Sequence, residues 1–323
     1  RVLLLGATGF LGRAVIKELK ELADIKILCS SRNVNREIIS ENVSWFFFDY
    51  SMGLDTLSEY IDKSDVIINC LGELNDESKM PFVNFEFVRQ LSDMIIKYER
   101  KKWFIQLSSV GCYGAIDSDS NFYKKIDEVS PTNPKGTYET TKTFADEYVL
   151  STFSSQNLHS FTIVRPTNVF GVEMKSYAIK ALMNVVKSGR FFYIGDRESV
   201  STYVHVDDVA YALTCILKKP SLSMNNIFIV SDDCPQKLLI KCFSDVFGVK
   251  NKFPVLPRRL IYFLIMISNV LKVRLPLDNS KFLSLTSKVS FANERLKELG
   301  YSPKQSIYKE DVVKSLAKRW GVL

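Results

Sequence analysis

Residues 2–12 read VLLLGATGFLG, and this stretch decides the fold of the chain. Its four apolar residues suit a short buried strand, which runs into Gly6, Gly9 and Gly12. An amphipathic stretch follows at 13–22, so a strand, a glycine loop and a helix come in succession. In such a turn the first glycine permits the tight bend, the second lets backbone N–H groups approach a pyrophosphate, and the third lets the helix pack against the strand. We therefore predict a nucleotide cofactor here, against the alternative of a tight turn without a ligand. Further contacts of the loop with the cofactor are predicted at Thr8, Phe10 and Leu11.

The end of the second predicted strand should contact the adenosine ribose of that cofactor. Folds that prefer NAD place an acidic residue there, which bonds the ribose hydroxyls. This chain has Ser30, Ser31 and Arg32 after the run 26–29, and no acid. A guanidinium with two hydroxyls suits a 2′-phosphate, so the sequence favours NADP(H) and leaves NAD(H) as the alternative. The competing interpretation is an exposed loop arginine that binds nothing.

Predicted strands and helices alternate along the first 230 residues. Apolar runs at 43–48, 65–72, 103–107 and 226–230 predict strands, and helical spacing returns between 83 and 98. This alternation predicts an α/β fold with a doubly wound parallel (Rossmann) sheet, whose active site lies at the carboxyl ends of the strands.

No linker-like segment or internal repeat divides the chain. We therefore expect a smaller C-terminal α/β substrate-binding region that is interleaved with the nucleotide domain. Residues 1–165 with 202–231 are assigned to the Rossmann domain, and residues 166–201 with 232–323 to the substrate-binding region.

Tyr138 and Lys142 form a chemically suggestive pair. They stand four residues apart at the start of a helical pattern, so both side chains should project from one face. A tyrosine has an ordinary pKa of roughly 10, and a nearby cation lowers it towards proton exchange. The pair is common by chance, and taken alone it is more simply a surface helix pair. Ser109 follows the strand at 103–107, so it would lie at the carboxyl ends of the strands, where the active site is expected.

Composition narrows the class of protein. The 323 residues are 46% apolar and 24% charged, as in an ordinary globular protein, and the net charge of +7 favours anionic partners. No aromatic-studded basic run suggests nucleic-acid binding. With two histidines and six cysteines that lack C-x-x-C spacing, we expect no metal site and free thiols in a reducing compartment. Because the first strand begins at residue 2, we expect no signal peptide and a cytoplasmic location.

The most apolar stretch of the chain is 260–267. It is flanked by Arg258, Arg259, Lys272 and Arg274, and it is too short to span a bilayer, which needs about 20 apolar residues. The favoured interpretation is a buried helix. The alternative is peripheral membrane contact through 258–274, with the cations near lipid headgroups on the cytoplasmic face.

Five motifs in register resemble those of the extended (atypical) short-chain dehydrogenase/reductases, the group of NAD(P)-dependent nucleotide-sugar epimerases, dehydratases and reductases. The resemblance covers about residues 1–230, and 296–303 also resembles the C-terminal signature of that group. The motifs are the glycine triplet, Ser108–Ser109 before Tyr113–Gly114, Tyr138-x-x-x-Lys142, Arg165–Gly171 and Val206–Ala210.

The resemblance implies that Tyr138 is the general acid/base, that Lys142 holds the nicotinamide ribose and lowers the pKa of Tyr138, and that Ser109 bonds the reacting oxygen. It also implies a homodimer formed through helices around 84–99 and 138–154. Substrate contacts are implied at Asn168 and at Ser201. Cofactor contacts are implied at Asp49, Tyr50, Leu71, Gly72, Ser108 and Pro166.

Three departures from the family pattern shape the expected reaction. Val110 and Gly111 stand where 4,6-dehydratases carry Asp-Glu, so water elimination is not expected. The ribose-reading acid is missing, which favours net reduction with NADPH. Ser201 replaces an arginine that usually meets the substrate pyrophosphate, which leaves the carrier half of the substrate open.

The expected function is thus an NADP-dependent reductase of a keto-sugar carried on a nucleotide, in surface polysaccharide (O-antigen-like) biosynthesis. The alternative is an NAD-dependent C4 epimerase of a nucleotide-linked or polyprenyl-diphosphate-linked sugar. A third interpretation, from another class, is a non-catalytic nucleotide-binding scaffold.

Overall fold

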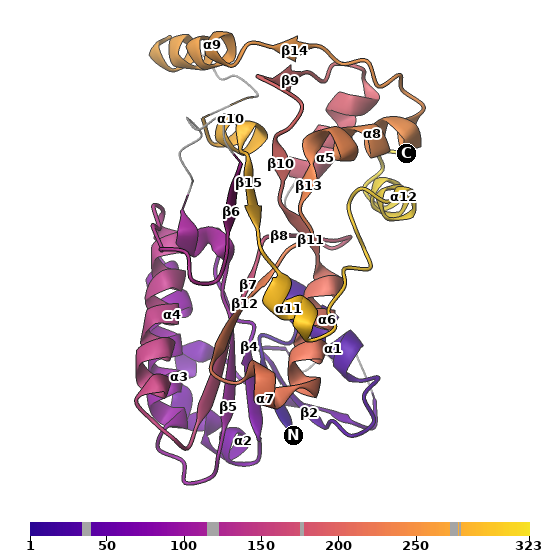
Figure 1. Cartoon of the computed structure of the whole chain (residues 1–323). Helices are drawn as coiled ribbons and strands as arrows, with labels where there is room; N and C mark the ends of the chain where they lie inside the picture. Colours follow the sequence, from indigo (N-terminus) through magenta and orange to yellow (C-terminus); the bar gives the residue numbers. More distant parts are fainter. Residues whose placement is uncertain (34–39, 115–122, 175–177, 272–276, 278) are drawn as a thin grey trace.

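A seven-stranded sheet forms the centre of the computed structural model, which describes residues 1–33, 40–114, 123–174, 178–271, 277 and 279–323 (Figure 1). Its order in this part of the chain is β12-β7-β5-β4-β1-β2-β3, and each neighbouring pair is parallel. The strands are β1 (Val2–Leu5), β2 (Ile27–Ser31), β3 (Val43–Phe47), β4 (Val66–Asn69), β5 (Trp103–Leu107), β7 (Ser160–Pro166) and β12 (Asn226–Val230). The order reverses between β1 and β4, so the predicted doubly wound sheet is confirmed.

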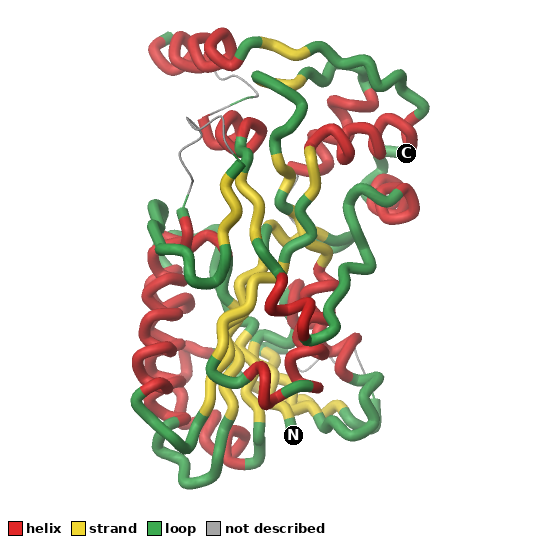
Figure 2. The backbone as a smooth tube through the Cα atoms, in the orientation of Figure 1, coloured by secondary structure: helices red, strands yellow, loops and turns green. Residues whose placement is uncertain are grey.

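Alternate side chains of the strands enter two separate cores, because successive residues of a strand point to opposite faces. Leu4 and Ile105 pack with helices α1 and α6 on one face, and Leu3 and Phe104 pack with α3 and α4 on the other. Figure 2 shows helices on both sides of the strands. These helices are α1 (Phe10–Leu19), α6 (Val206–Lys218), α3 (Phe87–Ile95) and α4 (Thr137–Ser154).

A further core lies beyond the carboxyl ends of the strands. It draws its buried residues from 170–193 and from 234–322, so distant parts of the chain share it. Its helices are α5 (Ala178–Lys187), α8 (Gln236–Phe247) and α12 (Glu310–Arg319). Short strand pairs surround it: β8 (Asn168–Phe170) with β11 (Tyr203–His205), β10 (Val200–Ser201) with β13 (Cys234–Pro235), β9 (Tyr193–Ile194) with β14 (Val255–Leu256), and β6 (Lys124–Ile126) with β15 (Val289–Phe291). The division into two interleaved regions stays a prediction.

The shorter elements complete the connections. The helical pattern predicted at 83–98 divides into a π-helical turn and α3. Each of the six cysteines carries a free thiol. The short elements are η1 (Tyr50–Met52), η2 (Leu54–Leu57), α2 (Ser58–Asp62), the π-helical η3 (Pro81–Glu86), η4 (Val110–Tyr113), α7 (Pro220–Ser223) and α11 (Glu294–Glu298).

The apolar stretch 260–267 lies in α9 (Arg258–Val270), which packs on α10 (Asn279–Thr286). The favoured interpretation of this stretch as a buried helix is wrong, because only one side of α9 is covered. Lys272 and Arg274, which belong to the membrane prediction for 258–274, lie outside the described residues. Among the helices that the structure describes, none has the length and apolar character needed to cross a membrane.

Candidate active site

The glycine loop joins β1 to α1 at the carboxyl edge of the sheet. Gly6 has a φ of +74°, a left-handed conformation that favours glycine. A Cβ on Gly12 would lie 2.2 Å from the carbonyl oxygen of Gly6, so only glycine lets the helix approach this closely. Gly9 precedes α1, and within the described chain no side chain caps the first amides of that helix. Uncapped amides at a helix N-terminus suit an anionic diphosphate, so the loop fits the predicted cofactor.

The two serines at the end of β2 bond within the protein. The hydroxyl of Ser30 accepts a hydrogen bond from the amide of Gly6 at 3.1 Å, which ties β2 to the glycine loop. The hydroxyl of Ser31 donates to the carbonyl of Asn33 and accepts from its amide. Both serines are buried. Of the three residues predicted to bind a 2′-phosphate, Arg32 is therefore the exposed one.

Arg32 is exposed beside two other predicted cofactor residues. Its guanidinium carbon lies 6.0 Å from the ring centre of Tyr50. Asp49 begins η1 and accepts hydrogen bonds from the amide and hydroxyl of Ser51, both at 2.9 Å. These bonds, with a smaller contribution from the Arg32 cation, lower the pKa of Asp49. The three side chains thus form one polar rim beyond β2 and β3.

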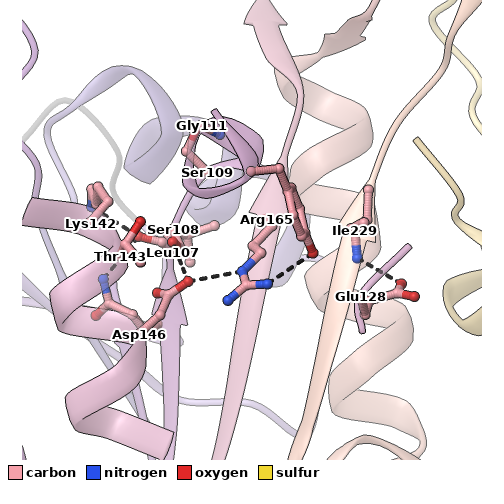
Figure 3. Close-up of polar contacts among 12 residues, drawn as sticks. Leu107, Ser108, Ser109, Gly111, Glu128, Lys142, Thr143, Asp146, Arg165 and Ile229 are labelled. Atoms are coloured by element: carbon pink, nitrogen blue, oxygen red, sulfur yellow. Dashed lines mark hydrogen bonds and ion pairs between the residues drawn. The ribbon is translucent and has the colours of Figure 1, made fainter. Parts of the chain in front are cut away.

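Lys142 is almost fully buried on α4, with 4% of its surface exposed. Its ammonium donates to the carbonyl of Leu107, at the end of β5, at 3.0 Å (Figure 3). It also donates to the carbonyl of Leu71, just after β4, at 3.4 Å. A Cβ on Gly72 would lie 3.3 Å from this ammonium, so the glycine leaves room for it. Burial lowers the pKa of Lys142 to about 8.

Tyr138 lies one turn earlier on α4 and meets Ser109. Burial raises the pKa of Tyr138 to about 12, a hydrogen bond with Ser109 opposes this rise, and the carboxylates of Asp146 and Glu139 add to it. Lys142 was expected to lower the pKa of Tyr138, but it does not contribute here. Its ammonium points to backbone carbonyls instead. Ser109 also accepts from the amide of Gly111 at 3.0 Å, which fixes its position at the start of η4. The phenol is therefore held in its protonated form at neutral pH.

Asp146 and Arg165 form a buried ion pair near Tyr138 and Ser109, and the sequence did not predict it. Asp146 accepts from Ser108 at 2.8 Å and from the guanidinium of Arg165 at 2.9 Å, and Arg165 also donates to the hydroxyl of Tyr113 at 2.9 Å (Figure 3). Burial raises the pKa of Asp146, and the Arg165 cation opposes that rise. The signal in the sequence was Arg165, a charged residue within the apolar run of a buried strand. The hydroxyl of Ser108 joins this network, and its contact with the cofactor stays a prediction.

Two buried amides, also missed, shape the loop after β4. Asn69 donates to Gln106 at 2.9 Å and accepts from the amide of Leu71 at 3.1 Å. Asn84 accepts from the amide of Glu73 at 2.8 Å and donates back to its carbonyl at 3.0 Å. These bonds fix the backbone of 71–73, whose first carbonyl receives the Lys142 ammonium.

The predicted substrate residues lie on the other side of the site. Asn168 is exposed on β8 and donates to the hydroxyl of Thr202 at 3.1 Å. Ser201 on β10 is 9% exposed, and Pro166 is buried at the end of β7. A cavity of about 570 Å³ between α1 and α6 is lined by Phe10 and His205 among others, and it does not include the catalytic candidates.

Comparisons with known proteins show the family of the chain and its fold. The model of the NAD dependent epimerase/dehydratase family matches residues 2–230. The crystal structure of gox2253 is 24% identical, with a TM-score of 0.74 over 100% of this chain and 99% of that one. UDP-glucose 4-epimerase from Thermotoga maritima, solved with UDP-glucose, is 18% identical, with a TM-score of 0.70 over 99% of each chain. RMD from Pseudomonas aeruginosa, solved with NADPH, is 17% identical, with a TM-score of 0.63 over 99% of each chain. No curated protein sequence matches the chain. At these identities the solved structures show a shared fold.

Proposed function

The chain belongs to the NAD dependent epimerase/dehydratase family, and we propose that within this family it is an NADP-dependent reductase of a keto-sugar carried on a nucleotide. The match confirms the family expected from the motifs and makes the chain an NAD(P)-dependent enzyme of the extended short-chain dehydrogenase type. The observation that carries the proposal is that Ser109 lies beside Tyr138, while Lys142, four residues further along α4, reaches the loops after β4 and β5.

In the proposed reaction Tyr138 donates the proton that the sugar oxygen gains. NADPH, bound with its diphosphate at the glycine loop, supplies the hydride. Ser109 donates a hydrogen bond to the same oxygen, where negative charge develops as the carbonyl is reduced. Lys142 lies between the ends of β4 and β5, where its ammonium can bond a ribose hydroxyl and bring a positive charge towards the phenol.

Tyr138 can serve both reduction and epimerisation. In reduction its phenol donates a proton, and in epimerisation it also removes a proton from the sugar hydroxyl. The choice between the two reactions therefore rests on the cofactor. The NAD-dependent C4 epimerase of a nucleotide- or polyprenyl-diphosphate-linked sugar is the second candidate, and the family name favours keeping it.

Arg32 supports the choice of NADPH. It is the exposed cation at the end of β2, next to Tyr50. An exposed guanidinium at this position can bond a 2′-phosphate in bidentate fashion, whereas NAD offers only hydroxyls there. Arg32→Gln should weaken NADPH binding by tenfold or more and leave NADH binding within about twofold. Equal losses for both cofactors would contradict this assignment.

The decisive experiment is a screen of NADPH oxidation against keto-sugar nucleotides with the purified chain. We expect turnover with at least one of them, and Tyr138→Phe should abolish it while NADPH still binds. Tyr148→Phe, on the same helix with its hydroxyl bonded to Asp93 at 2.6 Å, is the matched control and should stay active. Retention of NAD through purification, without NADPH oxidation, would instead establish the epimerase.

We also propose a homodimer through η3, α3 and α4, in the cytoplasm, with a role in surface polysaccharide biosynthesis. Three large apolar side chains on these elements, Phe82, Phe144 and Leu150, are 39%, 48% and 42% exposed. Covering them in a helical interface would remove this apolar surface from water. Sedimentation analysis should give twice the chain mass, and Phe144→Glu should shift it to the monomer mass.

A further inference from the structure

Helix α9 lies at the end of the molecule away from the central sheet (Figures 1 and 2). Its inner side packs on α10: Ile261 and Ile265 are 5% and 1% exposed and belong to a small core with Phe282 and Ile194. Among the described side chains of the helix, most of the others are exposed. This buried stripe therefore anchors α9 to the rest of the protein.

The described residues on the open side of α9 are mainly apolar. Phe263 is 60% exposed, and residues of the next turns on the same side are exposed to a similar degree. Elsewhere in the described chain, exposed large apolar residues lie further apart along the sequence. We call the exposed set the α9 face; it consists of Leu260, Tyr262, Phe263, Leu264, Met266, Ile267 and Leu271.

Positive charge is concentrated in the part of the sequence that contains this face. Residues 246–293 contain eight basic residues and one acidic residue, so their net charge of +7 equals that of the whole chain. The remaining residues are therefore electrically balanced. Of these cations, Lys250, Lys252, Arg259 and Lys281 are exposed in the structure, and Lys288 pairs with Asp196 at 2.6 Å.

From this combination we propose that the α9 face lies on an anionic membrane surface, with its apolar side chains at the boundary of the acyl chains and its cations at the headgroups. An amphipathic helix with an apolar face and flanking cations binds in this way. The charge favours an anionic membrane over a second copy of the chain as the binding partner. A second copy on the same face would bring together two segments that each carry a net charge of +7, and these would repel each other. The proposal does not depend on the identity of the sugar, and its test measures no turnover.

The test is co-sedimentation of the full chain with vesicles at 0.15 M salt. Vesicles of phosphatidylcholine with 30% phosphatidylglycerol should retain the chain, and vesicles of pure phosphatidylcholine should retain at least tenfold less. Raising the salt to 0.5 M should weaken binding, because the charges are then screened over a shorter distance. Each exposed cation replaced, as in Arg259→Gln, should reduce the partition coefficient about fivefold.

Variants of the α9 face separate it from the rest of the surface. Phe263→Ser with Met266→Ser should lose vesicle binding by at least tenfold, and circular dichroism should show the fold intact because both side chains are exposed. The matched control is Leu158→Ser with Leu222→Ser, which removes two exposed apolar residues elsewhere and should bind as the unchanged chain does.

Three results would overturn the proposal. The first is the absence of retention on anionic vesicles at low salt. The second is unchanged binding by the Phe263→Ser, Met266→Ser variant. The third is self-association without lipid that this variant abolishes, because the α9 face would then be an interface between copies of the chain.

Discussion

Replacing Lys142 by methionine should make the protein more stable while it abolishes turnover. The lysine is 4% exposed, and burial lowers its pKa from 10.5 to about 8. At about 1.4 kcal/mol for each pKa unit, the folded state bears a cost of about 3 kcal/mol for keeping this cation. Methionine removes that cost and fills a similar volume.

The gain is reduced by the hydrogen bonds that methionine cannot make. The ammonium donates to Leu107 at 3.0 Å and to Leu71 at 3.4 Å, and together these bonds contribute about 2 kcal/mol. The net expectation for Lys142→Met is a protein about 1–2 kcal/mol more stable at pH 7.

The pH dependence has a definite direction. Because the pKa of Lys142 is lowered in the folded state, the cost is fully present below about pH 8 and disappears as the pH rises towards 10.5, where the unfolded lysine also loses its proton. The unchanged protein should therefore gain stability over this range, and Lys142→Met should not.

Urea unfolding followed by circular dichroism at pH 7 and pH 10 measures both effects. The matched control is Lys102→Met, since Lys102 is equally buried but donates to the three carbonyls of Ile61, Asp62 and Ser64 at 2.7–2.8 Å. This control should lose about 2–3 kcal/mol. If Lys142→Met is less stable than the unchanged protein at pH 7, and the difference is the same at pH 10, the electrostatic reasoning is refuted.

Arg165→Met leaves the buried carboxylate of Asp146 without its cation and should cost about 3–5 kcal/mol in urea unfolding. Adding Asp146→Asn should recover part of this loss, and a full additive loss would contradict the pairing. Gly12→Ala places a Cβ 2.2 Å from a backbone oxygen and should weaken NADPH binding more than tenfold in a fluorescence titration. Gly136→Ala, where an added Cβ meets nothing within 4 Å, should bind normally. Burial raises the pKa of Asp233 from 3.8 to about 7, so folding loses stability as the pH rises from about 4 to 7, and Asp233→Asn should flatten that part of the stability profile.

The sequence alone determined the class of fold and the centre of the site. Local spacing carries this information: the glycine triplet after four apolar residues predicts the nucleotide-binding turn, and the separation of Tyr138 from Lys142 places both on one helix face. The structure has both features where they were predicted. They follow from the geometry of a few consecutive residues, which tertiary packing does not alter.

Only the tertiary structure decided how the groups at the site are paired. Asp146 and Arg165 are 19 residues apart and come from a helix and a strand. The hydroxyl of Ser30 accepts a hydrogen bond from a backbone amide of the glycine loop, 24 residues away. Burial raises the pKa of Tyr138, and the Lys142 ammonium donates to backbone carbonyls after two other strands. A buried polar group forms its hydrogen bonds with the groups that the fold places next to it. Packing between segments that are distant in the sequence determines which groups these are. The exposure of α9 was decided in the same way, because the pattern of a helix shows that it has an apolar face but not how much of that face the rest of the chain covers.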